Sequence, residues 1–143
     1  MKTTVNEISS STHIDAPIEA VWAAITTPSQ IKQWFFGVDT KSDWKVGSRL
    51  VHTGEYQGKP YVDKGEIIEF EPPRRLAHTH WSDVSGTPDD AEHYQVVVWE
   101  LAETDGGTDL TITERNLPSE DAAATSEQAW KAALGSLKAL LER

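Results

Sequence analysis

The sequence predicts an α+β fold in which an antiparallel β-sheet is covered by one long C-terminal helix. Three observations carry this prediction. Residues 7–14 show the period-two pattern of a strand, two short helix patterns follow within residues 15–37, and five further strand patterns fill residues 48–114. Residues 119–143 carry an apolar stripe at helical spacing. Because a curved sheet must bury its concave face, we expect this last helix to cover it.

The N-terminal elements begin with the strand over residues 7–14, in which every second residue from Ile8 shares one face. The next residues, DAPIEAVWAAITTP, predict a helix that is capped by Asp15 and has Pro17 in its first turn. The following PSQIKQWFFG predicts a second short helix that ends at Gly37.

The five later strands are expected over residues 48–53, 64–70, 75–81, 94–103 and 108–114. Turn sequences separate them. We expect GEYQGKP to form a hairpin loop, EPPR a turn, SDVSGTPDDAE a polar loop and TDGG a tight turn. This succession of strands and turns is typical of an antiparallel sheet.

The C-terminal helix is expected to begin at Ser119, which is a good N-cap and is followed by two acidic residues at the positive end of the helix dipole. Ser126 is an alternative start, because the intervening AAATS is weakly specified. The apolar stripe of this helix comprises Trp130, Leu134, Leu137 and Leu141.

Composition narrows the class of protein. A chain of 143 residues suits a single domain spanning residues 1–143. The absence of cysteine excludes disulfides and thiolate chemistry. With a net charge of −10 and no basic cluster larger than Arg74-Arg75, nucleic acid is not an expected partner. No apolar run approaches the ~20 residues of a membrane span and MKTTVNEISS does not read as a signal peptide, so we expect a cytoplasmic protein without membrane insertion.

Five segments in order resemble a known family. They are IDAPIEAVWAAITTPSQIKQWF, VGSRL, GEIIEFEPPRRLAHTHW, VVVWEL with GGTDLTIT, and the C-terminal helix with its apolar stripe. Together, over about residues 8–141, they resemble the homologues of the activator of the ninety-kilodalton heat-shock protein ATPase. That family belongs to the SRPBCC superfamily, which includes START domains and the birch pollen allergen.

The resemblance implies a helix-grip fold, in which a seven-stranded antiparallel curved sheet wraps around the long C-terminal helix and two short helices follow the first strand. It also implies a cavity for a hydrophobic ligand between sheet and helix. It does not imply one activity, because members of this superfamily include carriers, cyclases, oxygenase subunits and co-chaperones.

The candidate cavity residues are those that alternation and the resemblance place on inward positions. They are Trp34, Phe35, Leu50, His52, His78, His80, Val97, Trp99, Leu110, Ile112, Glu114, Trp130, Leu134 and Leu137. The alternative is that these residues simply form a filled core without a ligand.

Four polar side chains stand out in this set, namely His52, His78, His80 and Glu114. Burying them requires hydrogen-bond partners. They could be specificity groups in a ligand pocket, a metal site, a general acid–base pair, or satisfied residues with no further role. We assign no metal, because His52 lies two strands from the other histidines, roughly 10 Å away at the usual strand spacing. We assign no catalytic residue or cofactor, because no nucleophile or oxyanion-hole motif accompanies them.

An acidic loop segment and one arginine are interpreted as structural features. Asp89, Asp90, Glu92 and His93 could hold a cation weakly, but their spacing lacks the calcium-loop pattern and favours a solvated loop. Arg75 is expected to pair with a neighbouring carboxylate.

The function predicted from these observations is small-molecule binding, with an apolar or aromatic ligand (lipid, polyketide or flavonoid-like) in the cavity. One alternative is a co-chaperone-like or stress-response interaction domain, although the eukaryotic co-chaperone has an additional N-terminal domain for which we expect no room here. A further alternative is a cavity enzyme, such as a cyclase or hydrolase, that uses His80 or Glu114. We expect a monomer or weak dimer, and favour a binding protein over an enzyme.

Overall fold

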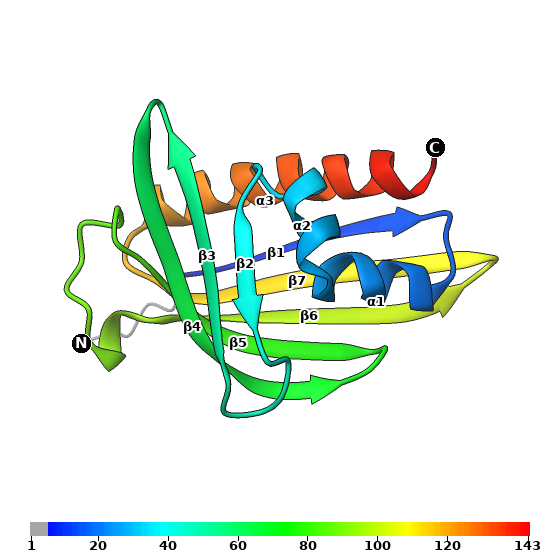
Figure 1. Ribbon diagram of the computed structural model, residues 1–143, viewed down its shortest axis with the longest axis horizontal. Helices are drawn as coiled ribbons and strands as arrows, with labels where there is room; N and C mark the ends of the chain where they lie inside the picture. Colours follow the sequence, from blue (N-terminus) through cyan, green and yellow to red (C-terminus); the bar gives the residue numbers. More distant parts are fainter. Residues whose placement is uncertain (1–5) are drawn as a thin grey trace.

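A computed structural model describes residues 6–143, which form a seven-stranded antiparallel sheet with three α-helices packed against it (Figure 1). The elements in chain order are β1 (Asn6–Ile14), α1 (Ile18–Thr26), α2 (Pro28–Trp34), β2 (Asp39–Ser42), β3 (Arg49–Tyr56), β4 (Lys59–Glu71), β5 (Arg75–Ser82), the short 3-10 helix η1 (Ala91–His93), β6 (Gln95–Thr104), β7 (Gly107–Leu117) and α3 (Glu120–Leu141). The strand order is β1-β7-β6-β5-β4-β3-β2. This architecture confirms the expected helix-grip fold.

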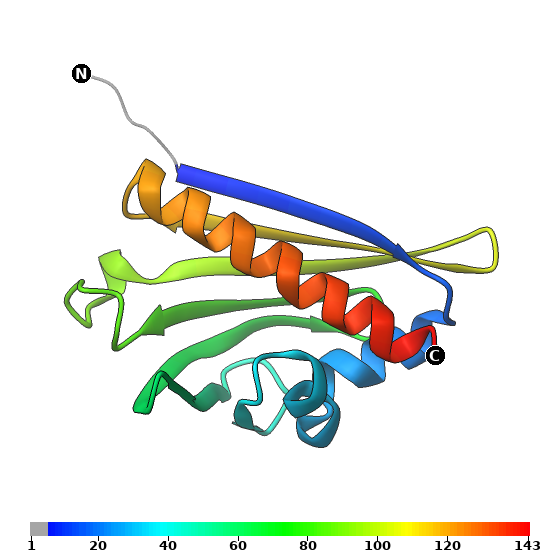
Figure 2. The same ribbon diagram turned by 90° about the horizontal axis from the view of Figure 1, so that it is seen from above.

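The sheet curves around α3, which crosses it diagonally (Figure 2). Gly65 in β4 permits part of this curvature, because a Cβ atom at that position would lie 1.7 Å from the carbonyl oxygen of Thr79 on β5. A register shift between Ile67 and Glu69 marks a bulge in the same strand. β4 therefore bends where it passes from the central sheet into the long β3–β4 hairpin.

The core lies between the sheet and the helices. Leu134 and Leu137 of α3 are buried as expected, whereas Trp130 and Leu141 are half-buried. Burial of this apolar surface is the main force that stabilises the fold. None of the helices described within residues 6–143 has the length and apolar character required to span a bilayer.

The β3–β4 hairpin is longer than the sequence predicts. The segment GEYQGKP is mostly paired strand, and only Gln57 and Gly58 form the turn, with φ angles of 52° and 83°. Tyr56 pairs with Lys59, and Glu55 with Pro60. The expectation of a long loop is wrong because both faces of these arms are largely exposed, so the sequence there lacks the apolar alternation that indicates a strand.

β2 is the strand that the residue pattern alone does not predict. Its sequence, DTKS, contains no apolar residue, yet Thr40 pairs with His52 and Ser42 with Leu50 along β3. Pairing with a neighbouring strand thus overrides weak local propensity. β2 completes the seven strands that the family resemblance implies.

The helix starts agree with the sequence in one case and differ in another. α3 begins at the predicted cap, where the Ser119 hydroxyl accepts a 3.0 Å hydrogen bond from the Ala122 amide, so the alternative start at Ser126 is wrong. α1 is preceded by Pro17 at the N-cap position, without a side-chain capping bond. The predicted cap Asp15 instead contacts His13 Nε2 at 3.1 Å.

Candidate ligand-binding site

The four predicted polar residues face the interior of the grip, as the strand alternation indicates. His52 lies on β3, His78 and His80 on β5, and Glu114 on β7, and all four are buried or half-buried. The register of β5 is the predicted one, since Leu76 and His78 are buried on the inward face. A fifth polar residue, Asp63 on β4, joins them and was missed because the strand was expected to begin at Lys64.

His78 is fully satisfied by hydrogen bonds within the protein. Its Nδ1 lies 2.9 Å from the Thr79 carbonyl oxygen, to which it donates, and its Nε2 accepts a 3.0 Å hydrogen bond from the Trp99 indole. Burial lowers the pKa of His78 to about 3, so the imidazole is neutral at physiological pH. Both ring nitrogens are therefore engaged in structural contacts.

His52, which lines the same small space as His78, also has a hydrogen-bond partner within the protein. Its Nδ1 lies 2.7 Å from the Thr40 hydroxyl of β2. Burial, followed by the proximity of His80, lowers the pKa of His52 to about 4. The polar strand β2 therefore supplies the hydrogen-bond partner that a buried histidine in β3 requires.

His80 and Asp63 form a half-buried pair between β5 and β4. The His80 Nε2 atom lies 3.4 Å from Asp63 Oδ2, and the two side chains are 26% and 17% exposed. Burial alone would lower the pKa of His80, but Asp63, with smaller contributions from Glu114 and Gln95, more than offsets it, so the pKa is raised. Burial would raise the pKa of Asp63, but His80, with smaller contributions from Ser82 and His52, more than offsets this, so that pKa is lowered. The pair therefore favours an imidazolium facing a carboxylate.

Glu114 on β7 is hydrogen-bonded to side chains of α3. It does not form the hydrogen-bonded pair with a histidine that general acid–base chemistry would use. Its Oε1 atom accepts a 2.9 Å hydrogen bond from the Trp130 indole and another from the Ser126 hydroxyl. The helix is thus anchored to the sheet by a charge-assisted network.

Aromatic side chains fill most of the space that the sequence assigns to a cavity. Phe35 stacks on Trp130 with ring centroids 5.7 Å apart, and Trp99 meets Trp130 edge-on at 5.4 Å. The space that remains beside Trp34 and His52 is about 20 Å³. This is room for roughly one water molecule. Most of the predicted cavity residues therefore lie in a packed core, and their contact with a ligand stays a prediction.

A larger, open groove is lined on one side by the β3–β4 hairpin and on the other by the N-terminal half of α3, two segments that lie apart in Figure 2. Its volume is about 840 Å³. Three apolar side chains on its rim are strongly exposed, namely Phe36 at 56%, Tyr56 at 70% and Val84 at 70%. The remaining lining residues are Glu55, Gln57, Lys59, Tyr61, Asp63, Ser82, Thr125, Gln128, Ala129 and Ala132. We call this space the hairpin groove.

The sequence does not predict the hairpin groove, because the segments that line it have the residue patterns of loops and of an exposed helix face. None of the predicted cavity residues is among its lining residues within the described chain. The one signal was the spacing of Tyr61 and Asp63, which share the inward face of β4 with Ile67. The small side chains of Ala129 and Ala132 leave the space open on the helix side.

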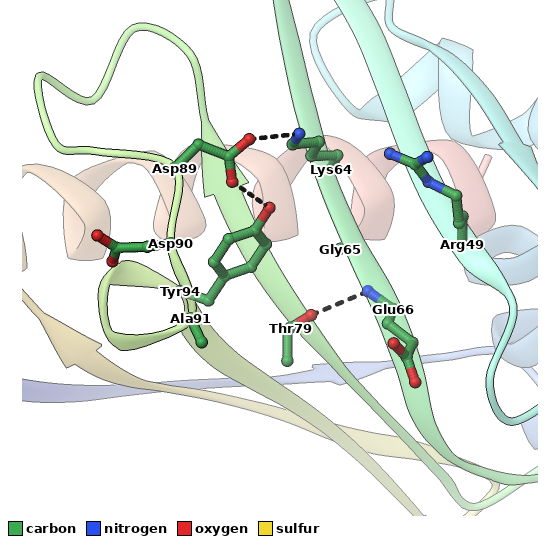
Figure 3. Close-up of a pocket in the computed structure, with 9 residues that line it drawn as sticks. All are labelled: Arg49, Lys64, Gly65, Glu66, Thr79, Asp89, Asp90, Ala91 and Tyr94. Carbon is green, nitrogen blue, oxygen red and sulfur yellow. Dashed lines mark hydrogen bonds and ion pairs between the residues drawn. The ribbon is translucent and has the colours of Figure 1, made fainter.

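A second hollow of about 560 Å³ lies on the outer face of the sheet, away from α3 (Figure 3). Two of its charged groups pair with each other: Asp89 lies 2.6 Å from the Lys64 ammonium and accepts a 2.7 Å hydrogen bond from the Tyr94 hydroxyl. The lining of this hollow is mostly polar and charged, whereas the hairpin groove has a rim of exposed apolar side chains. We therefore place the candidate site in the hairpin groove.

The acidic loop next to this outer hollow brings potential cation ligands together. Within residues 6–143, Asp90, Glu92 and His93 form the one group of potential metal-ligating atoms that lie within 4.8 Å of one another. Asp90 and His93 are already hydrogen-bonded to each other, and the acidic residues are exposed. This agrees with the interpretation of a solvated loop. Arg75 forms the predicted ion pairs, with Glu69 at 3.0 Å and Glu100 at 2.7 Å.

Comparison with known proteins places this chain in a family. A family model described as Activator of Hsp90 ATPase homolog 1-like protein matches residues 15–142. No curated protein matches the chain. The solved structure of ChR145 from Cytophaga hutchinsonii is 40% identical, covers 95% of this chain and 93% of its own, and superposes with a TM-score of 0.81.

Two further solved structures extend the comparison. CalU16 from Micromonospora echinospora is 30% identical over 92% of this chain and 73% of its own, with a TM-score of 0.72. The Aha1 dimer from Colwellia psychrerythraea is 22% identical over 95% of this chain and 96% of its own, with a TM-score of 0.76, and shares the fold. The chain therefore belongs to the family of Activator of Hsp90 ATPase homolog 1-like proteins.

Proposed function

We propose that this protein binds a small apolar or aromatic molecule, such as a lipid, a polyketide or a flavonoid-like ring, in the hairpin groove. The observation that carries the proposal is the groove itself, with a volume of about 840 Å³ and an apolar rim. Small-molecule sites have volumes of roughly 300–1,000 Å³ and combine apolar walls with a few polar groups. Phe36, Tyr56 and Val84 supply the apolar contacts, and Asp63 and Ser82 supply polar ones.

The exposure of the rim supports the proposal independently of the volume. Large apolar side chains that gather at one place on the surface of a soluble protein usually mark an interaction site. Here they come from three separate segments, the loop after α2, the tip of the β3–β4 hairpin and the loop after β5. A ligand between them would bury all three side chains at once.

A groove-filling substitution tests this function. Ala129→Trp should abolish saturable binding of 1-aminoanthracene, a neutral fluorophore that brightens in apolar sites, because the indole would occupy the space on the helix side. Ala139→Trp, at an exposed position of α3 that does not line the groove, is the matched control and should bind the fluorophore like the wild type. Binding that survives Ala129→Trp unchanged, or a wild-type protein that shows no saturable binding, would refute the proposal.

A co-chaperone-like role is the second candidate function, and the observation that favours it is the family to which the chain belongs. The exposed apolar rim of the groove would then contact a protein partner. The test is the ATPase rate of purified Hsp90 with and without an excess of this protein. An increased rate that Ala129→Trp abolishes favours this function, and an unchanged rate counts against it.

A further inference from the structure

We infer that the hairpin groove selects ligands whose polar end donates a hydrogen bond, as a protonated amine or a hydroxyl does, and that Asp63 is the acceptor. This inference rests on the proposed function, because it specifies the head group of the ligand in the same groove. It differs from the general expectation of a hydrophobic ligand by excluding carboxylates such as fatty acids.

Asp63 combines burial with an unused acceptor atom. Its side chain lines the groove beside Tyr61 and Ser82, yet only 17% of it is exposed. The Oδ2 atom faces His80 at 3.4 Å, whereas Oδ1 is buried and has no hydrogen-bond partner in the described structure. A buried acceptor without a partner raises the free energy of the protein, and an ionised carboxylate most of all. A ligand donor that reaches Oδ1 would relieve that cost.

His80 acts as a positioning residue for this acceptor. It does not line the groove, and its Nε2 atom is directed at Asp63. The contact fixes one oxygen of the carboxylate and leaves the other for a ligand. The Nδ1 atom of His80 has no partner within the described residues, but His80 does not line the groove and is therefore poorly placed to receive a negatively charged head group itself.

The charges around the groove favour the same class of ligand. Among the lining residues within 6–143, Glu55 and Asp63 are acidic and Lys59 is the one basic residue, next to the hairpin turn. The whole chain carries a formal net charge of −10. A carboxylate head group would therefore meet like charge near Asp63, whereas an ammonium group would be attracted.

Three probes with one ring system isolate the head group. We would titrate the ¹⁵N-labelled wild-type protein at pH 7.5 with 1-naphthylmethylamine, 1-naphthalenemethanol and 1-naphthoate, and follow the amide signals of Tyr61, Ala129 and Ala132. The expected order of affinity is amine, then alcohol, then carboxylate. The step from amine to carboxylate should be about tenfold or more, as expected for a hydrogen bond to a charged group.

Asp63→Asn identifies the acceptor. It keeps the size of the side chain but removes the charge, so the affinity for the amine should fall about tenfold while that for the carboxylate stays equal or rises. Asp43→Asn, at an exposed position outside the groove, is the control and should retain the wild-type order. The ranking of the three probes on the wild-type protein tests the inference even if the Asp63 variant does not fold.

The outcomes separate this inference from the proposed function. If all three probes bind at the groove with equal affinity, or if the carboxylate binds best, the inference is wrong and the proposed function stands. If the amine binds best but Asp63→Asn leaves the ranking unchanged, Asp63 is not the acceptor and the inference is also wrong. If no probe shifts the groove signals, the proposed function fails together with the inference.

Discussion

At the scale of single residues, polar side chains in the grip fall into two groups. His52, His78 and Glu114 have partners within the protein and hold strands and helix in place. Asp63 and His80 retain buried polar atoms without a hydrogen bond in the described structure. Each buried polar group without a partner costs roughly 1–3 kcal/mol. The second group is therefore the one from which binding specificity is expected.

The buried neutral state of His52 predicts how stability responds to acid. Its pKa is about 4 in the folded protein, because of burial and then of nearby His80, against 6.5 for an ordinary histidine. The unfolded chain therefore binds more protons between these values, so stability falls as the pH drops from 6.5 to 4. His52→Gln should weaken this loss by roughly 3 kcal/mol, as measured by urea unfolding at pH 8 and pH 4.

His13 provides a control of opposite sign. Its hydrogen bond to Asp109 outweighs burial and raises the pKa, so its contribution to stability is full at low pH and is lost as the pH rises through the folded value. His13→Gln should therefore steepen the loss of stability on acidification. If His52→Gln and His13→Gln change the pH dependence in the same direction, our assignment of a buried neutral His52 is wrong.

At the scale of elements, the sequence predicts a strand correctly where one face of that strand is buried and the other is exposed. It does not predict a strand that lacks this difference between its faces. Leu50 and His52 alternate with the more exposed Arg49 and Val51, and the structure confirms that pattern. The outer arms of the β3–β4 hairpin and the strand β2 have no such alternation, because they are held by pairing with neighbours and not by their own burial. Asp63 belongs to one of these arms. The sequence therefore predicted neither this part of β4 nor the candidate site to which it contributes.

The bend in β4 supplies a prediction at this scale. Gly65→Ala should lower the free energy of unfolding by about 2 kcal/mol or more, because its Cβ atom would be placed 1.7 Å from the Thr79 carbonyl oxygen. Gly135→Ala on the exposed face of α3 is the matched control. It meets no atom within 4 Å and should stabilise the protein by roughly 0.5–1 kcal/mol. Equal effects of the two substitutions in chemical denaturation would show that β4 does not depend on this close approach.

At the scale of the whole molecule, the helix-grip fold has a closed half and an open half. Where α2 and the aromatic residues pack on the sheet, the remaining space is about 20 Å³. Where the hairpin and the first half of α3 diverge, the groove measures about 840 Å³. The family resemblance predicted the fold and a space between sheet and helix. It did not predict which half stays open, because that depends on how individual aromatic side chains such as Trp99 and Trp130 pack.

The central claim is that a ligand binds in the open half of the grip, and intermolecular nuclear Overhauser effects test it most directly. We would record them between bound 1-aminoanthracene and the methyl groups of the ¹³C-labelled protein. The account predicts contacts to Ala129, Ala132 and Val84, which line the hairpin groove. Contacts to Ile31, Leu50 and Leu76 instead, around the small space beside Trp34 and His52, would contradict it.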